Sequence, residues 1–114
     1  MGVILVLTSV EKFDTAEALA RRLVERRLAA SVDILGPVRS FYRWKGAVVV
    51  AEERMLQIKT VRDNLERVRE AIRDGSGYEL PEMLVVDVAG GDEAYLNWLG
   101  AQCAPAAPVD SDAS

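Results

Sequence analysis

The sequence predicts an α+β domain in which an antiparallel sheet carries helices on one of its faces. Two observations support this prediction. The elements follow the order strand, helix, strand, strand, helix, strand, and the second and third strands form a hairpin longer than a compact core requires. A chain of 114 residues is the size of one domain. The order of elements is that of a ferredoxin-like split βαβ sandwich, extended here by the hairpin and a C-terminal helix.

The first strand and the first helix are predicted from their hydrophobic patterns. Residues 3–7 are a continuous apolar run, which is typical of a strand in the centre of a sheet. Asp14 and Glu17 have the spacing of a capping box, so we expect a helix to begin there. Apolar residues recur at helical spacing from Ala16 to Val24, and the four arginines between positions 21 and 27 are predicted to form a solvated face.

The middle of the chain predicts the long hairpin. Residues 28–35 form the second strand, which Gly36-Pro37 stops or bends because proline cannot donate a hydrogen bond to a sheet. Residues 38–44 resume the extended chain, Lys45-Gly46 turns it back, and residues 47–60 form the returning strand. Strand alternation places the following residues on one side of the first arm: Val38, Ser40, Tyr42 and Trp44.

The last third of the chain predicts a helix, a strand and a short helix. An apolar stripe from Val61 to Ile72 indicates a helix that ends at Asp74-Gly75, and residues 83–88 form the fourth strand. Asp92 is expected to cap a final helix whose buried side is Tyr95, Trp98 and Leu99. Residues 1–103 therefore form a single domain, and residues 104–114 are predicted to be a disordered C-terminal tail.

Composition argues against several classes of partner and compartment. A formal net charge of −4, from 18 acidic and 14 basic residues, disfavours a nucleic-acid surface. No apolar run approaches the roughly 20 residues that span a bilayer, so no membrane partner is expected. The N-terminal residues favour a strand over a signal peptide. Because a lone cysteine, Cys103, cannot form an internal disulfide, we expect a cytoplasmic protein.

The sequence offers no recognisable catalytic centre. The chain has no histidine, which removes the commonest proton shuttle. Ser9, Ser31 and Ser40 have no partner at a useful spacing in the sequence. The Cys-x-x-Cys pair of a metallochaperone is also absent, because the chain contains one cysteine. We therefore predict that the protein is not an enzyme.

Several separated motifs resemble the CutA divalent-cation tolerance family over residues 2–100. They are Ser40-Phe41-Tyr42-Arg43-Trp44-Lys45-Gly46, then Glu53, Lys59-Thr60, Tyr78-Glu79-Leu80-Pro81-Glu82 and Tyr95-Leu96-Asn97-Trp98. The resemblance implies a ferredoxin-like protomer that its extended hairpin assembles into a homotrimer, with an architecture similar to the PII-type signalling trimers. The hairpin aromatics Phe41, Tyr42 and Trp44 are predicted to form the oligomer interface. Tyr42 and Trp44 could instead stack on a ligand.

The cofactor that the resemblance suggests is a divalent metal ion, copper above all. Copper prefers imidazole and soft sulfur ligands. This chain has no histidine, and Ser76-Gly77 occupies the positions of the family's usual His-Pro pair. A copper site is therefore weakly supported, and the metal ligands are unknown.

The resemblance also implies that five residues gather near the cleft between protomers: Glu53, Lys59, Tyr78, Glu79 and Glu82. Six residues of extended strand span about 20 Å, so Glu53 and Lys59 are expected to serve different neighbours. The glutamates could hold a hard cation weakly, or they could accept hydrogen bonds from loop backbone and arginines. Lys59 could bind an anion beside the following helix N-terminus, or it could pair with Glu79 or Glu82 of another subunit.

Two functional hypotheses follow from these residues. The first is a non-enzymatic homotrimeric CutA-like protein associated with tolerance of, or response to, divalent metal ions such as copper. The alternative is a PII-like sensing and interaction module that binds a small anionic metabolite at the cleft between subunits. The protein's expected partner is a second copy of itself, and any small-molecule or protein partner is unidentified.

Overall fold

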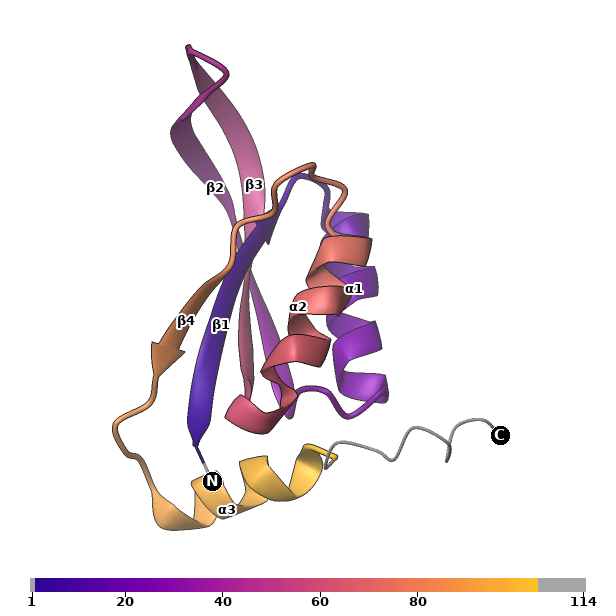
Figure 1. Ribbon diagram of the computed structural model, residues 1–114, viewed down its shortest axis with the longest axis vertical. Helices are drawn as coiled ribbons and strands as arrows, with labels where there is room; N and C mark the ends of the chain where they lie inside the picture. The colour runs from indigo at the N-terminus through magenta and orange to yellow at the C-terminus, as the bar shows by residue number, and fades with distance from the viewer. Residues whose placement is uncertain (1, 105–114) are drawn as a thin grey trace.

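The computed structural model describes residues 2–104 and contains one sheet and three α-helices (Figure 1). The predicted disordered tail therefore lies, apart from Ala104, outside the described residues. A single 3₁₀ turn precedes the second helix. The elements are β1 (Val3–Val10), α1 (Phe13–Glu25), β2 (Ser31–Trp44), β3 (Ala47–Val61), the 3₁₀ turn (Arg62–Asn64), α2 (Leu65–Gly75), β4 (Leu84–Asp87) and α3 (Glu93–Gln102).

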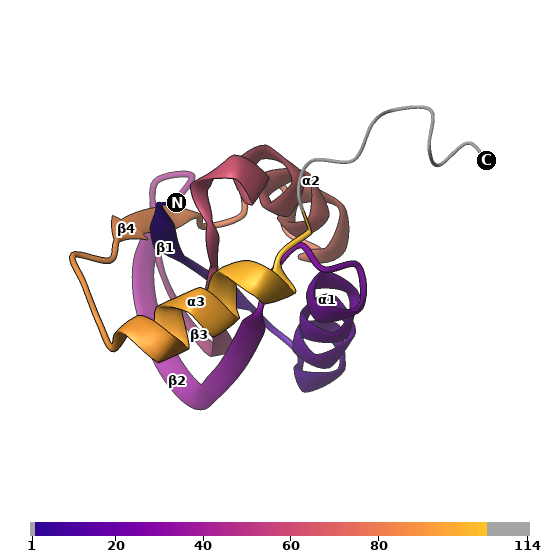
Figure 2. The ribbon, with the colours of Figure 1, turned by 90° about the horizontal axis from the view of Figure 1, so that it is seen from below.

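The sheet has the strand order β2-β3-β1-β4, and every pair of neighbouring strands is antiparallel. Helices α1 and α2 lie beside each other on one face of this sheet (Figures 1 and 2). This arrangement confirms the predicted fold class. In an antiparallel sheet of this kind one face forms the core and the other is left open.

The core lies between the sheet and helices α1 and α2. Alternate residues of β1 and β3 point toward the helices, as the two-residue period of a strand requires. The following strand and helix residues form one buried cluster: Ile4, Val6, Leu56 and Ile58 from the sheet, and Leu19, Leu23, Val68 and Ile72 from the helices. The apolar stripes recognised in the sequence are therefore the surfaces that build this core.

The hairpin of β2 and β3 projects beyond the rest of the molecule (Figure 1). Gly36-Pro37 bends β2 without ending it, since the strand continues through a bulge between Leu35 and Val38. The turn is Lys45-Gly46, and both of its residues have positive φ angles, of 51° and 85°. The radius of gyration is 15.0 Å, compared with about 13 Å for a compact domain of this length. The hairpin makes the molecule elongated.

Helix α3 crosses the end of the sheet opposite the hairpin (Figures 1 and 2). Leu99 and Cys103 pack with Ala30 against Val3 and Val61. The Asp92 side chain accepts a hydrogen bond from the backbone N–H of Tyr95, which confirms the predicted cap.

The predicted buried side of α3 is wrong for two of its three residues. Leu99 is buried, but Tyr95 is 43% and Trp98 is 45% exposed. Their rings stack on each other with centroids 5.6 Å apart. Of the three, only Leu99 belongs to the buried cluster with Ala30 and Cys103, so the aromatic spacing identified a helix face that residues 2–104 do not cover.

Several boundaries differ from those predicted. Strand β2 begins at Ser31 and not at residue 28, and α2 begins at Leu65, because Val61 is the last residue of β3 and a 3₁₀ turn follows it. Helix α1 begins at Phe13, and Lys12 is its N-cap with no side-chain cap hydrogen bond. Asp14 consequently lies inside the first turn, where its charge is favourable to the helix dipole without a capping box. Strand β1 runs on to Val10, and β4 is limited to Leu84–Asp87. Within residues 2–104, no helix is long and apolar enough to cross a membrane.

Candidate functional site

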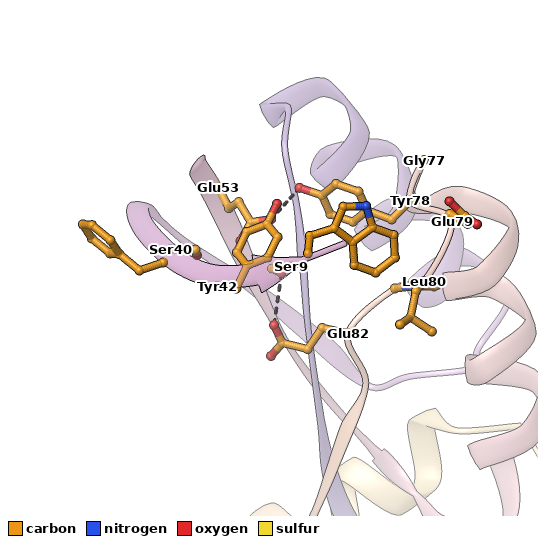
Figure 3. Close-up of a pocket in the computed structure, with 12 residues that line it drawn as sticks. Ser9, Ser40, Tyr42, Glu53, Gly77, Tyr78, Glu79, Leu80 and Glu82 are labelled. Atoms are coloured by element: carbon orange, nitrogen blue, oxygen red, sulfur yellow. Dashed lines mark hydrogen bonds between the residues drawn. The ribbon is translucent and has the colours of Figure 1, made fainter. Parts of the chain in front are cut away.

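A pocket of about 810 Å³ opens at the base of the projecting hairpin (Figure 3). Its walls come from β1, β2, β3 and the loop that joins α2 to β4. The lining residues are Ser9, Ser40, Phe41, Tyr42, Trp44, Glu53, Gly77, Tyr78, Glu79, Leu80, Pro81 and Glu82. Pockets that bind small molecules in proteins have volumes of about 300 to 1,000 Å³ and combine apolar walls with a few polar groups.

Three side chains of β2 that line the pocket lie at alternate positions of the strand. Ser40, Tyr42 and Trp44 follow one another at every second position of β2, and all three line the pocket. Their register partners on β3 are Ala51, Val49 and Ala47, which are small or aliphatic. Of the four residues predicted to share one side, Val38 does not line the pocket, and Phe41, of the opposite parity, does.

Glu53 and Tyr78 form the innermost polar contact of the pocket. The Tyr78 hydroxyl donates a hydrogen bond to Oε2 of Glu53 (Figure 3), and Glu53 is only 5% exposed. Burial and the neighbouring Glu53 carboxylate both raise the pKa of Tyr78 above its ordinary value of 10.0. The phenol therefore remains protonated and serves as a donor throughout the physiological range.

The loop before β4 is fixed to β1 through Glu82. Ser9 Oγ donates to Oε1 of Glu82 at 3.2 Å, as Figure 3 shows, and Thr8 Oγ1 donates to the Glu82 carbonyl oxygen at 2.7 Å. At the other end of the loop, Ser76 Oγ accepts a hydrogen bond from the Tyr78 backbone N–H at 3.1 Å. These contacts hold Tyr78 and Glu82 in place on one wall of the pocket.

The rim of the pocket holds an ammonium group that belongs to the chain itself. Lys45 Nζ lies 3.9 Å from Oε1 of Glu79. The same nitrogen lies 5.7 Å from the centroid of the Trp44 ring, within the range of a cation–π contact. Both side chains of the Lys45–Glu79 pair are largely exposed, so the pair contributes little to stability.

Lys59 lies elsewhere in the single chain. Its Nζ is 3.0 Å from Oδ2 of Asp33, and Lys59 is paired in register with Ser31 toward the α3 end of the sheet. The hydrogen bond to Asp33 raises the pKa of Lys59, against the opposing effect of burial. The structure thus brings together Glu53, Tyr78, Glu79 and Glu82 of the five predicted binding residues, but not Lys59. That neighbouring copies bring Lys59 to the site stays a prediction.

The charge of the pocket lining is negative. Three carboxylates and no lysine or arginine are among its lining residues. Within the described chain, no lysine or arginine nitrogen lies within 4.0 Å of the carboxylates of Glu53 or Glu82. The chain's own lining therefore offers no countercharge to an anionic ligand.

One chain does not assemble a metal centre in its described part. Between Gly2 and Ala104, no group of three or more histidine, cysteine, aspartate or glutamate residues is placed to hold a metal ion. Cys103, the sole cysteine, is buried beside Thr60 near the C-terminal end of β3, whereas Glu53 lies near the middle of that strand. The donor set of a single chain does not fit copper.

Two residues of the site were not recognised from the sequence. Ser9 was considered to have no partner, yet its hydroxyl meets Glu82, 73 residues later in the chain. Lys45 was recognised as a turn residue and as part of a family motif, but not as a partner of Glu79. No local sequence signal reveals either contact, because both depend on the loop before β4 folding back against β1 and the hairpin.

Comparisons with known proteins agree on one family. The sequence profile of the CutA1 divalent ion tolerance proteins matches residues 4–102. The "Divalent-cation tolerance protein CutA" of Thermus thermophilus is 37% identical over 94 residues, which cover 82% of this chain and 91% of that protein. The "Protein CutA, chloroplastic" of Arabidopsis thaliana is 34% identical over 84% of this chain, which spans about half of that longer relative.

Solved structures give the same result. The structure of the divalent cation tolerance protein from Thermus thermophilus superposes with a TM-score of 0.87 at 34% identity, covering 90% of this chain and 99% of that one. The crystal structure of CutA1 from Oryza sativa superposes with a TM-score of 0.90 at 29% identity, covering 93% of this chain and 97% of that one. The similarity therefore extends over the sheet, the hairpin and all three helices.

Proposed function

Because the chain belongs to the CutA divalent ion tolerance family, we propose that it works as a non-enzymatic homotrimer in tolerance of, or response to, divalent metal ions such as copper. The observation that carries the assembly is the open face of the sheet. Residues Leu5 and Leu7 of β1 point away from the helices and are only half-buried, and their β4 partners Val86 and Leu84 are exposed. A contiguous apolar face of this kind marks a protein contact.

The projecting hairpin supports the same assembly. Phe41 is 66% exposed, and Val48 and Val50 near the tip are exposed as well. Exposed strands with large apolar side chains invite pairing with another chain. A trimer in which each hairpin packs on a neighbour would cover these residues, and Tyr42 and Trp44 would flank that contact.

The proposal assigns no chemical step to the protein. The chain has no histidine, and the pocket serine with a side-chain contact, Ser9, donates its hydroxyl to a carboxylate. The names of the family and of its relatives are not names of enzymes. Since the residues of one chain do not fit a copper centre, no step of the proposal is routed through a bound ion.

We also propose that the protein works in the cytoplasm. The support is the lone cysteine, Cys103, which is buried and free. The relative from Arabidopsis thaliana is named as chloroplastic, so the family is not confined to one compartment. Localisation of a tagged full-length chain tests this assignment, and export of the chain would contradict it.

Native mass spectrometry of the full chain tests both the assembly and the metal role. We expect a mass of three copies for the purified protein, before and after chelator treatment. Copper is then added back, and the mass of the assembly reports whether the ion is taken up stoichiometrically. A monomer would contradict the assembly. Unchanged metal sensitivity of cells lacking the protein would contradict the role in tolerance.

The chain offers a matched pair of variants for the assembly, since it has two phenylalanines and both are exposed: Phe41 on the hairpin and Phe13 at the start of α1, at 66% and 50%. Phe41→Asp places a charge in the proposed contact and is expected to yield monomers. Phe13→Asp makes the same chemical change on the helix side and is expected to leave the trimer intact. Equal effects of the two variants would contradict a hairpin contact.

A further inference from the structure

We infer that the pocket at the base of the hairpin binds a small organic cation, an ammonium group on an apolar body, and that this ligand displaces the Lys45 ammonium from the rim. The inference goes beyond the proposed role in metal tolerance and does not depend on it. It rests on the charge of the lining, on its aromatic walls and on the position of Lys45.

The charge of the pocket selects for a cation. Glu53 is 5% exposed and receives its hydrogen bond from a neutral donor, the Tyr78 hydroxyl. Glu82 likewise contacts the neutral Ser9 hydroxyl. A carboxylate removed from water without a countercharge is unfavourable, and a cation in the pocket would offset that penalty. A ligand with a positive centre is therefore favoured over an anionic one in this pocket.

The walls of the pocket select for an organic cation over a bare metal ion. Three aromatic side chains outside the proposed Phe41 contact line the cavity: Tyr42, Trp44 and Tyr78. Aromatic faces attract ammonium groups, and such contacts strengthen when water is excluded. Divalent metal ions require several directed oxygen, nitrogen or sulfur ligands, and the described residues contain no such group of three. A volume of about 810 Å³ accommodates an apolar body as well as the charged group.

Lys45 shows that the rim already holds an ammonium. Its Nζ lies 5.7 Å from the Trp44 ring centroid and 3.9 Å from Glu79 Oε1. The lysine stem is long and exposed, so it can leave the rim at small energetic cost. A free organic cation would occupy the same aromatic and acidic surroundings and would compete with Lys45.

The experiment follows the two indole N–H signals in ¹H–¹⁵N spectra of the full-length protein, in whatever assembly it adopts, during titration with choline. Trp44 lines the pocket, whereas Trp98 lies on α3 at the other end of the sheet. The neutral isostere 3,3-dimethyl-1-butanol is titrated in parallel. We expect saturable movement of the Trp44 signal alone, with the neutral compound binding about tenfold more weakly because it lacks the cation–π and carboxylate attraction.

Two variants separate the contributions. Trp44→Leu, followed through the backbone signal of Tyr78, is expected to abolish choline binding. Lys45→Met is expected to tighten it several-fold, because the competing ammonium is gone. Lys12→Met changes the net charge by the same amount on an exposed residue outside the pocket lining, and it is expected to leave the affinity unchanged.

The inference is overturned if the Trp44 signal does not saturate with choline, as when a neighbouring copy fills the pocket. It is equally overturned if the neutral isostere binds as tightly as choline. An affinity that Lys45→Met leaves unchanged overturns the displacement of Lys45. A monomeric mass in native mass spectrometry would contradict the proposed function but not this inference. An intact trimer that does not bind choline would contradict this inference but not the proposed function.

Discussion

The two halves of β3 have the same strand geometry and opposite surroundings. From Met55 to Val61 the strand alternates between residues buried under the helices and residues on the open face, and Leu56, Ile58 and Thr60 are fully buried. From Ala47 to Arg54 the strand leaves the helices behind, and Glu53 is its only buried residue. One half builds the core, whereas the other half presents apolar side chains outward and buries a carboxylate.

This difference indicates what each half is for. A core strand is explained by the hydrophobic surface that it removes from water. The outer half removes little apolar surface within its own chain, and its single buried side chain is acidic. Burial of a carboxylate among aromatic rings does not stabilise a fold for its own sake. We therefore attribute the outer half to the proposed contacts with a ligand or with another copy of the chain.

The largest effect is expected from a core truncation in the inner half. Ile58→Ala removes a fully buried side chain and should lower the free energy of unfolding by about 2 to 5 kcal/mol. Val48→Ala, an aliphatic truncation in the outer half, should change it by about 0.5 kcal/mol or less because Val48 is exposed. Urea denaturation at one fixed protein concentration measures both. A comparable loss in the two variants would show that the hairpin is as much a part of the folded core as the inner strand.

The next largest effect is expected for the hydrogen bond between Glu53, in the outer half of β3, and Tyr78, in the loop before β4. Tyr78→Phe removes the hydrogen-bond donor of Glu53 and should lower the free energy of unfolding by about 1 to 3 kcal/mol. Tyr95→Phe is the matched control, since Tyr95 is exposed on α3 and its hydroxyl makes no hydrogen bond within residues 2–104. Denaturation curves of both variants at pH 7 measure the change in the free energy of unfolding. Equal stability of the Tyr78→Phe variant and the unchanged protein would mean that water satisfies Glu53 and that the pocket is wetter than its burial implies.

The inner half was also the half that could be predicted from the sequence. Its period of two and the helical stripes of α1 and α2 are local patterns, and they identified the core correctly. The pocket residues came from the resemblance to a family, and the contacts between them could not be predicted. Ser9 and Glu82 meet across 73 positions of sequence, and Asp33 meets Lys59 only because of the register between β2 and β3.

Helix α3 shows a second limit of sequence patterns. Tyr95 and Trp98 have the spacing of a buried stripe, yet they are exposed in the single chain. Hydrophobic spacing identifies a face that avoids water, but it does not say whether the same chain or another copy covers that face. The same ambiguity applies to Phe41 on the hairpin. Sequence alone therefore separates core from interface poorly wherever the covering partner is another molecule.

A pH titration sharpens the contrast between the pocket and the rest of the surface. The pKa of Tyr78 is raised in the folded protein, chiefly by burial and then by Glu53. The folded state therefore holds this proton more tightly than the unfolded state does. The resulting stability is fully present below the ordinary tyrosine pKa of 10.0 and is lost as the pH rises above it, by at most about 1.4 kcal/mol for each pH unit.

Denaturation between pH 9 and pH 11 measures this loss, and Tyr78→Phe should remove its contribution. Ultraviolet absorbance of the phenolates supplies a direct readout, because the Tyr78 phenolate should form only above the ordinary tyrosine pKa of 10.0. If Tyr78→Phe lowers the phenolate absorbance near pH 10 while both proteins are folded, Tyr78 is not held by Glu53 in solution.

The smallest effect is expected at the inner end of β3, where Lys59 pairs with Asp33. The side chains are 24% and 48% exposed, so solvent screens the pair and its coupling should be about 0.2 to 1 kcal/mol. A double-mutant cycle of Lys59→Met and Asp33→Asn measures this coupling by urea denaturation. Because Lys59 lies outside the pocket lining, Lys59→Met should also leave the Trp44 indole signal unchanged. A shifted Trp44 signal, or loss of assembly, would mean that neighbouring copies bring Lys59 to the cleft. The two halves of β3 would then act on one shared site, and the division between them would hold only within a single chain.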